Sequence, residues 1–384
     1  MGKILDPTGQ HSGLMTAPAT SRTPADGPLE GRPGWRNHAF RLVKAATTPL
    51  LPEDYVDLFD PLRSTTQLRG RVEAVTPETT DAVTVTIRPG RGWRGHVPGQ
   101  YTRVGVDIDG VRMWRAYSIT SGPRTDSCIA ITVKAISGGA VSTHLVESLQ
   151  AGKVIQMEQA AGEFVLPQTL PRKVLLLTGG SGITPVMGIL RHTVERLDDV
   201  VLLHSAPRPE DVIFADELRG LAADGRISLQ ERHTDVDGML NATELDSLVP
   251  DWRERATFAC GPGGMLNALE SHWETAGLAD LLTIEKFRPA LREASGEGGT
   301  VRFTKLDREV ESPGSRPILD VGEEAGVLMP SGCRMGVCFG CVLPLREGSV
   351  RDLRSGDVTT AQPGDGVLIQ TCISAAAGRC DIDL

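Results

Sequence analysis

The sequence has no long apolar run. A helix that crosses a bilayer needs roughly 18–20 consecutive apolar residues, and no stretch of this chain approaches that length. The N-terminus also lacks the basic-then-apolar pattern of a secretory signal peptide. Long basic runs are absent from a chain whose formal net charge is -9, which argues against nucleic acid as a partner. These absences predict a soluble, cytoplasmic protein.

Cysteine occurs in an odd number, seven in 384 residues. Three of the seven lie in one short loop, which is not the distribution of a secreted disulfide framework. A reducing compartment is therefore expected. Apolar residues make up 40% of the chain, enough to fill the cores of two or three domains.

The cysteines near the C-terminus carry the strongest chemical signal. Cys333, Cys338 and Cys341 have the spacing C-x4-C-x2-C, and Cys372 follows a short strand-like run. Four thiolates at this spacing are typical of a plant-type [2Fe–2S] cluster. Zinc is the alternative metal, but C-x2-C pairs dominate zinc sites. The spacing therefore favours an iron–sulfur cluster held by these four residues.

Composition and periodicity divide the chain into five segments. Residues 1–66 form an N-terminal extension, whose first part is rich in Pro, Gly, Ser and Thr and is expected to be disordered. Short strands separated by turns predict an antiparallel barrel over 67–170. Buried strands that alternate with helices predict an open α/β sheet over 171–288. A flexible linker over 289–299 precedes a small C-terminal unit, 300–384.

Local patterns give a first placement of the elements. Pro52 and Glu53 are expected to open a short helix in the extension. One helix is expected in the barrel, over 142–150. The barrel strands are expected at 68–75, 82–87, 101–106, 116–120 and 129–134.

Arg115, Tyr117 and Ser118 lie together on one of these strands. A flavin needs an aromatic neighbour, a hydrogen bond at its ring edge and a cation for its phosphates, and these three side chains supply that set. An ordinary barrel strand explains the segment equally well by itself. Gly139 and Ser142 add a second signal. A glycine lets the backbone approach a ligand closely, and the amides at the start of the helix that follows can bind a phosphate. A plain helix cap, made by Ser142 or Thr143, is the structural alternative.

The nucleotide signals follow buried strands of the α/β unit. Gly180 and Gly182 stand between a strand and a helix, where a phosphate-cradling loop belongs, although the full dinucleotide fingerprint is absent. Cys260 follows another strand and can lie against a nicotinamide or simply be buried. Ser205 and Arg208 follow the second strand, where an acidic residue usually marks an NAD site. They favour a 2′-phosphate, and so NADPH over NADH.

This ordered set of motifs resembles the ferredoxin–NADP reductase superfamily, in the form with a plant-type ferredoxin domain at the C-terminus. The resemblance covers roughly residues 67–384. It implies a six-stranded antiparallel flavin-binding β-barrel, a Rossmann-like NAD(P) domain and a β-grasp [2Fe–2S] ferredoxin domain. It assigns catalytic roles to Ser118, Tyr117 and Cys260. The cofactor-binding residues it implies are Arg115, Tyr117, Ser118, Ser121, Gly139, Ser142, Gly180, Gly182, Thr184, Pro185, Gly261 and Pro262.

The implied activity is electron transfer from NADPH through FAD and the cluster to another protein. The extension and the run from Trp114 to Ser118 look like those of actinobacterial reductases that serve desaturases. The acceptor is therefore expected to be a fatty acyl desaturase or an oxygenase, with peripheral contact to a membrane-bound acceptor left open. One alternative is an FMN- and NADH-dependent reductase of an aromatic-ring dioxygenase or a cytochrome P450. Another is an iron–sulfur redox sensor, which would not need the electron-input domains.

Overall fold

The computed structural model describes residues 60–64, 67–108, 110–136, 139–287, 297–332, 334, 336 and 339–384. The expected helix at Pro52 and the Pro- and Gly-rich start of the extension lie outside these residues. Within the described ranges, no helix is long and apolar enough to cross a membrane.

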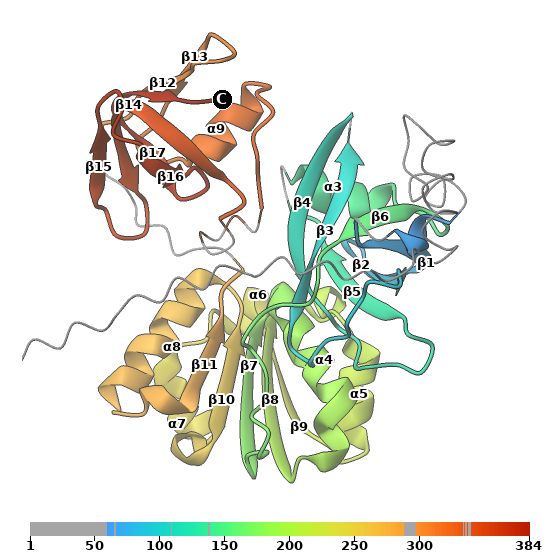
Figure 1. The fold of residues 1–384 in the computed structure, drawn as a ribbon. Coiled ribbons are helices and arrows are strands. Elements are labelled where there is room, and N and C mark those ends of the chain that lie inside the picture. The colour runs from blue at the N-terminus through green and yellow to red at the C-terminus, as the bar shows by residue number, and fades with distance from the viewer. Residues whose placement is uncertain are drawn as a thin grey trace, which may run out of the picture. The chain divides into compact units, whose positions relative to one another are not determined.

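An antiparallel sheet of six strands forms the first domain (Figure 1). Its order is β4-β3-β6-β1-β2-β5. A bridge between Ile119 and Ile131 connects the two edge strands and closes the sheet into a barrel. The strands are β1 (Arg69–Thr79), β2 (Ala82–Pro89), β3 (Tyr101–Ile108), β4 (Val111–Ser118), β5 (Ile129–Lys134) and β6 (Val154–Met157), with a 3-10 helix, η1 (Pro61–Arg63), before them and α3 (Ala140–Glu147) after β5.

Alternating apolar side chains fill the barrel, because successive residues of a strand point to opposite faces. Val85 and Ile87 of β2 and Ile131 and Val133 of β5 are fully buried in its core. The expected strand over 116–120 begins at Val111 instead. Its first half was missed because burial there is incomplete: Arg112 is exposed and pairs with Asp107, and Met113 and Trp114 are only partly buried.

The second domain is a parallel sheet of five strands in the order β11-β10-β7-β8-β9, as the alternating pattern predicted. Its strands are β7 (Lys173–Gly179), β8 (Asp199–Ala206), β9 (Ser228–His233), β10 (Ala256–Cys260) and β11 (Leu282–Glu285). Its helices are α4 (Ile183–Thr193), α5 (Ala215–Ala223), α6 (Thr234–Asp237), α7 (Leu245–Leu248) and α8 (Gly263–Thr275), and its 3-10 helices are η2 (Gly180–Gly182), η3 (Val194–Arg196), η4 (Pro209–Asp211), η5 (Ala242–Glu244), η6 (Trp252–Glu254) and η7 (Ala279–Leu281).

Helices cover both faces of this sheet, which is the usual arrangement of a parallel sheet. Leu176 and Leu202 pack against α4 and α5, whereas Leu175 and Leu203 pack against α7 and α8 (Figure 1). The strands are therefore apolar on both sides. Polar groups collect where the strands end.

The third domain is a mixed sheet in the order β13-β12-β17-β14-β15, with β16 paired to β14. β12 and β17 run parallel, and the other pairs are antiparallel. One helix packs against this sheet, as in a β-grasp fold. The elements are β12 (Gly299–Phe303), β13 (Arg308–Ser312), α9 (Ile318–Glu324), β14 (Val342–Asp352), β15 (Val358–Ala361), β16 (Leu368–Gln370) and β17 (Ser374–Ile382).

Candidate functional site

Strand β4 carries the three residues of the expected flavin motif at its C-terminal end. Ser118 is the last residue of the strand and is buried, while Tyr117 is only partly buried, so the two face opposite sides. Burial lowers the pKa of Arg115 to about 10, which still leaves a cation at neutral pH. Its Nη1 donates to the carbonyl of Trp114 at 2.8 Å. The buried hydroxyl of Ser121 accepts a hydrogen bond from the amide of Ala130 on β5, at 3.0 Å.

The second expected phosphate contact lies where α3 begins. The cap is Gly139, not Ser142 or Thr143, so the capping prediction is wrong. The hydroxyl of Ser142 lies in the first turn, where it accepts from the amide of Ile136 at 3.2 Å and donates to the carbonyl of Gly139 at 3.2 Å. A Cβ on Gly139 would come within 2.6 Å of that hydroxyl. Glycine is therefore required for the turn that presents the first amides of α3.

The loop between β7 and α4 lies against the end of β10. A Cβ on Gly182 would stand 2.0 Å from the carbonyl oxygen of Cys260, so only glycine permits this approach of two backbones. Gly180 has φ +53, a conformation that glycine adopts readily. The hydroxyl of Thr184 donates to the carbonyl of Ser181 at 2.9 Å and fixes the loop from inside. Pro185 lies in the first turn of α4, where its missing N–H leaves no helical bond unmade.

Ser118, Cys260 and Glu285 meet where the barrel contacts the parallel sheet. Ser118 lies beside the carboxyl group of Glu285, whose Oε2 is buried without a hydrogen-bond partner among the described residues, and Cys260 pairs in register with Glu285 on the neighbouring strand. Burial raises the pKa of Glu285 to about 8, against the opposing effect of the neighbouring Ser118 side chain. Burial and the nearby Glu285 also raise the pKa of the Cys260 thiol. At neutral pH the site therefore holds a neutral carboxyl and a neutral thiol.

The sequence analysis missed Glu285 as a functional residue. The signal was available, because Glu285 is a carboxylate at the carboxyl end of a strand in a parallel sheet, where ligands bind. What no local pattern shows is its contact with Ser118, 167 positions earlier in the chain.

The polar row continues across the sheet from Cys260. Thr178 pairs with Cys260 on one side and His204 on the other. The Oγ of Thr178 lies 2.8 Å from Nδ1 of His204. Burial lowers the pKa of His204 to about 4, so this imidazole is neutral at physiological pH. This contact with His204 fixes the side chain of Thr178, the last one on β7 before the glycine loop.

Arg191 of α4 joins the two domains beside the flavin motif. Its Nη1 donates to the carbonyl of Thr120 at 2.9 Å, its guanidinium lies 4.7 Å from the ring centroid of Phe214, and it forms an ion pair with Glu217. One turn earlier, a Cβ on Gly188 would stand 2.3 Å from the carbonyl oxygen of Ile119. The barrel and the parallel sheet are therefore in backbone contact where β4 ends.

The candidate 2′-phosphate residues, Ser205 and Arg208, lie at the carboxyl end of β8 and just after it. Ser205 is on β8, and its buried Oγ has no hydrogen-bond partner among the residues that the structure describes. Arg208 is exposed, and its Nε lies 3.0 Å from Oδ2 of Asp211. A phosphate at this position has to compete with that carboxylate, but an exposed ion pair contributes only about 0–1 kcal/mol.

Two of the four expected cluster ligands are described, Cys341 and Cys372. Both are buried, and a hydrogen bond between the two thiols lowers the pKa of Cys341 below its usual range. The Oγ1 of Thr371 donates to the carbonyl of Cys341 at 2.9 Å, which ties the two segments together. Cys333 and Cys338 lie outside the described residues, within which no group of three or more His, Cys, Asp or Glu is arranged around a metal position.

Comparison with known proteins finds matches to all three domains. Residues 86–166 match the oxidoreductase FAD-binding domain, residues 176–271 the oxidoreductase NAD-binding domain, and residues 303–377 the 2Fe-2S iron-sulfur cluster binding domain. An NADPH oxidoreductase of Mycobacterium tuberculosis is 44% identical over 385 residues, which span 98% of this chain and 99% of that protein. The chain is a flavin- and NAD-binding reductase of the ferredoxin reductase family. Its cofactors are FAD and a [2Fe–2S] cluster, and its substrate is NAD(P)H.

Two further proteins are similar to this reductase. The ferredoxin reductase component of 3-ketosteroid-9-alpha-monooxygenase from Mycolicibacterium smegmatis is 32% identical over 298 residues, which span 71% of this chain and 84% of that protein. Phthalate dioxygenase reductase shares the fold, with a TM-score of 0.58 and 22% identity, over 82% of this chain and 97% of that chain.

The residues of the reductase fit both cofactors. The end of β4 supplies a buried hydroxyl and a cation, and the start of α3 supplies amides for phosphate oxygens. Cys341 and Cys372 offer neighbouring sulfurs, one of which loses its proton easily, and thiolate is the form that binds iron. The fold, the flavin and cluster chemistry and the oxidoreductase activity expected from the sequence are thereby confirmed.

Proposed function

We propose that this reductase takes electrons from NADPH and delivers them, through FAD and the [2Fe–2S] cluster, to a separate oxygenase or fatty acyl desaturase. The observation that carries the proposal is the meeting of Ser118, Cys260 and Glu285 at the junction of the flavin and nucleotide domains. FAD, when bound, would supply the conversion of a two-electron hydride into single electrons, which suits a chain that also carries a one-electron cluster.

Each of the three residues has a distinct proposed role. Ser118 hydrogen-bonds at the flavin edge and lies beside Glu285. Cys260 contacts the nicotinamide as a neutral thiol, because its raised pKa prevents it from acting as a thiolate nucleophile. Glu285 holds a proton beside Ser118 at neutral pH. Because these groups are buried where two domains meet, they exclude water and hold nicotinamide and flavin in one orientation.

The proposal also assigns the residues that bind the flavin and the cluster. Arg115 and the first turn of α3, with Gly139 and Ser142, bind the flavin phosphates, while Tyr117 packs against the ring. Cys333, Cys338, Cys341 and Cys372 bind the cluster. The domains are proposed at 67–170, 171–288 and 300–384, after an extension over 1–66 and with a linker over 289–299.

NADPH is proposed as the preferred nucleotide. Ser205 and Arg208 lie where the adenosine ribose is expected, and no carboxylate occupies the end of β8. The mycobacterial relative is named an NADPH oxidoreductase. A charge-assisted hydrogen bond contributes about 1.5–3 kcal/mol. Replacing Arg208 with Ala is therefore expected to lower kcat/KM for NADPH about tenfold or more while leaving that for NADH unchanged.

The acceptor is proposed from the kind of protein that relatives serve. Two relatives are named as reductase parts of oxygenase systems, which supports an oxygenase or a chemically similar desaturase. Capture of the acceptor from the source cells, followed by NADPH-driven turnover with purified components, tests this step. The proposal fails if the wild-type protein reduces small dyes with NADPH but no captured oxygenase or desaturase turns over with it.

A further inference from the structure

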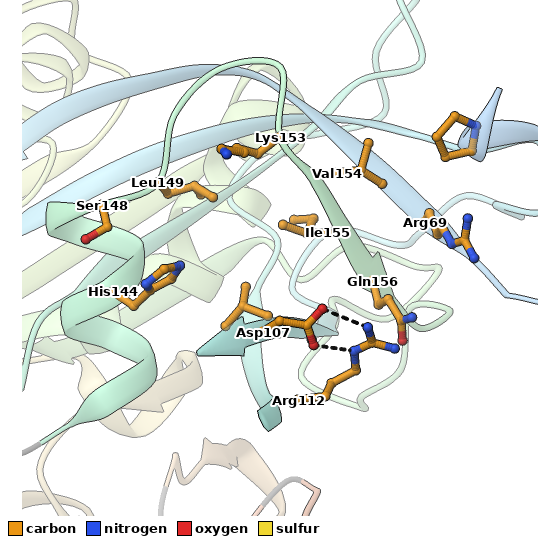
Figure 2. A pocket seen from close by; sticks show the side chains of 13 residues that line it. Arg69, Asp107, Arg112, His144, Ser148, Leu149, Lys153, Val154, Ile155 and Gln156 are labelled. Atoms are coloured by element: carbon orange, nitrogen blue, oxygen red, sulfur yellow. Dashed lines mark hydrogen bonds and ion pairs between the residues drawn. The ribbon is translucent and has the colours of Figure 1, made fainter. Parts of the chain in front are cut away.

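A hollow of about 500 Å³ lies on the flavin barrel, where Asp107 and Arg112 pair in its lining (Figure 2). All of its described lining residues belong to the barrel domain or to η1 just before it. The hollow therefore has no part in the parallel sheet of the nucleotide domain. In that sheet, a buried polar pair lies at the carboxyl ends of two neighbouring strands, Thr178 on β7 and His204 on β8.

Thr178 and His204 belong to a polar row that crosses all five strands of this sheet. At one position of the register, the strands in the order β11, β10, β7, β8 and β9 carry Glu285, Cys260, Thr178, His204 and Glu231. Residues paired in register in a parallel sheet point to the same face. The row therefore lies on the face that α4 and α5 cover, because Cys260 is part of the core on that side.

His204 is buried at a position where the strand is otherwise apolar. The residues before it on β8, 200–203, are all buried Val or Leu. Oγ1 of Thr178 lies 2.8 Å from Nδ1 of His204, whereas Nε2 is buried without a hydrogen-bond partner among the described residues. Burying a polar group that is only half satisfied costs free energy. Within the described part of the chain, the contact with Thr178 is the one hydrogen-bonding contact of this ring.

The glycine loop, residues 179–182, follows Thr178 directly and has the sequence Gly-Gly-Ser-Gly. Its glycines permit close approach of the segment after β10, since a Cβ on Gly179 would stand 2.7 Å from Cδ of Pro262. Glycine loses more conformational freedom than any other residue when a chain becomes ordered. A loop of this composition therefore needs anchors outside itself.

Two buried threonines hold the glycine loop at its two ends. Thr184 holds the far end from α4, where its hydroxyl donates to the carbonyl of Ser181 at 2.9 Å. Thr178 holds the near end, and its own side chain is fixed by His204. Because His204 is embedded in the core of the sheet, the start of the loop is anchored to β8, 26 residues further along the chain.

We propose that His204 is a positioning residue for the nucleotide, which acts through Thr178 to hold the glycine loop in the conformation that binds the pyrophosphate of NAD(P)H. The inference rests on the proposed assignment of this loop to the nucleotide. An anchored loop loses less conformational entropy when its ligand binds. NADPH and NADH both carry the pyrophosphate, so the contact strengthens the binding of both. The hydride transfer itself does not depend on it.

The test uses the full chain with bound FAD and cluster. His204→Leu and Thr178→Val each remove one side of the contact, and the double variant removes both. His204→Asn is the conservative variant, because asparagine carries a polar atom near the position of Nδ1 and its amide can donate or accept. The matched control is Thr193→Val, which removes a buried hydroxyl that donates to the carbonyl of Ile189 at the other end of α4, at 2.6 Å.

Stopped-flow flavin reduction at increasing nucleotide concentration gives the dissociation constant and the limiting rate for NADPH and for NADH. We expect His204→Leu and Thr178→Val each to raise both dissociation constants about tenfold, with the limiting rates changed less than twofold. The double variant should be no weaker than either single variant, because all three lack the same contact. His204→Asn should come within about threefold of the wild type, and Thr193→Val should match it.

The pH dependence gives an independent readout. Burial lowers the pKa of His204 to about 4, with smaller and opposite effects from Glu231 and His233 on β9, so the ring is neutral above pH 6. The ratio of the His204→Leu and wild-type dissociation constants should therefore stay constant from pH 6 to pH 9. A ratio that changes across this range would contradict the proposal, because the contact would then depend on charge.

Three other results would overturn the inference. A loss confined to NADPH would place the effect at the 2′-phosphate. Additive losses in the double variant would show that the two residues act independently, and a His204→Asn variant as weak as His204→Leu would show that packing alone is at work. Urea unfolding checks that each variant folds, and Thr178→Val, which keeps the shape of the side chain, carries the test if His204→Leu does not. The proposed function fails separately, if neither nucleotide reduces the flavin of the wild type.

Discussion

Glu285 is expected to make the stability of the nucleotide domain depend on pH. Its pKa is about 8 in the folded chain and 4.5 without the fold. Between these values the folded chain retains a proton that the unfolded chain has lost. Raising the pH through this window therefore lowers the free energy of unfolding. The destabilisation begins near pH 4.5 and is complete above pH 8.

The size of the effect follows from the pKa difference. Each pH unit inside the window costs about 1.4 kcal/mol. The cost reaches about 3 kcal/mol at pH 7 and about 5 kcal/mol at pH 9. Both figures are upper limits, because Glu285 retains some contact with solvent and water lowers the penalty of charging it.

Replacing Glu285 with Gln removes the ionisation and keeps the shape of the side chain. We expect Glu285→Gln to match the wild type near pH 5 and to exceed its stability by up to about 5 kcal/mol at pH 9. Urea unfolding followed by tryptophan fluorescence measures this, because Trp252 and Trp273 are fully buried in the same domain. Glu163→Gln, at an exposed carboxylate in the barrel, is the matched control.

The same variant separates stability from catalysis. The rate of flavin reduction by NADPH should show an apparent pKa near 8 in the wild type and lose that inflection in Glu285→Gln. A wild-type stability that stays flat between pH 5 and 8 would refute the reasoning. So would a Glu285→Gln variant that is less stable than the wild type at pH 9.

Three further substitutions test the other parts of the electron path. Ser118→Ala should slow flavin reduction roughly 10- to 100-fold in stopped-flow measurements with an unchanged cluster spectrum, because it removes a hydrogen bond of about 1.5–3 kcal/mol. Arg191→Met should slow the same step about tenfold without weakening NADP+ binding, because it misplaces the flavin domain relative to the nucleotide domain and removes no contact to the nucleotide. Glu217→Gln, which removes the charge of one partner of Arg191, should have less than a twofold effect. Cys372→Ser should abolish the cluster absorption while NADPH still bleaches the flavin, and an intact cluster in that variant would show that Cys372 is not a ligand.

Local sequence patterns predicted most of the fold. The apolar runs of β7, β8 and β10 predict buried parallel strands, because such strands are covered on both faces. The alternation of apolar and polar residues over Ala82–Pro89 likewise predicts a barrel strand. The patterns failed where local propensity is weak. In the first half of β4, Arg112 is exposed and pairs with Asp107, and Met113 and Trp114 are only partly buried; β6 has only four residues.

The candidate site divides along the same line. The cysteine spacing by itself predicted an iron–sulfur cluster, because three of the four expected ligands lie within nine residues and their spacing can be read directly from the sequence. The glycines at 180 and 182 likewise predicted a tight turn between β7 and α4, where the structure has η2. Only the tertiary structure decided that Glu285 lies beside Ser118. The two residues are far apart in the chain, and the raised pKa of Glu285 arises from burial, which no local pattern records.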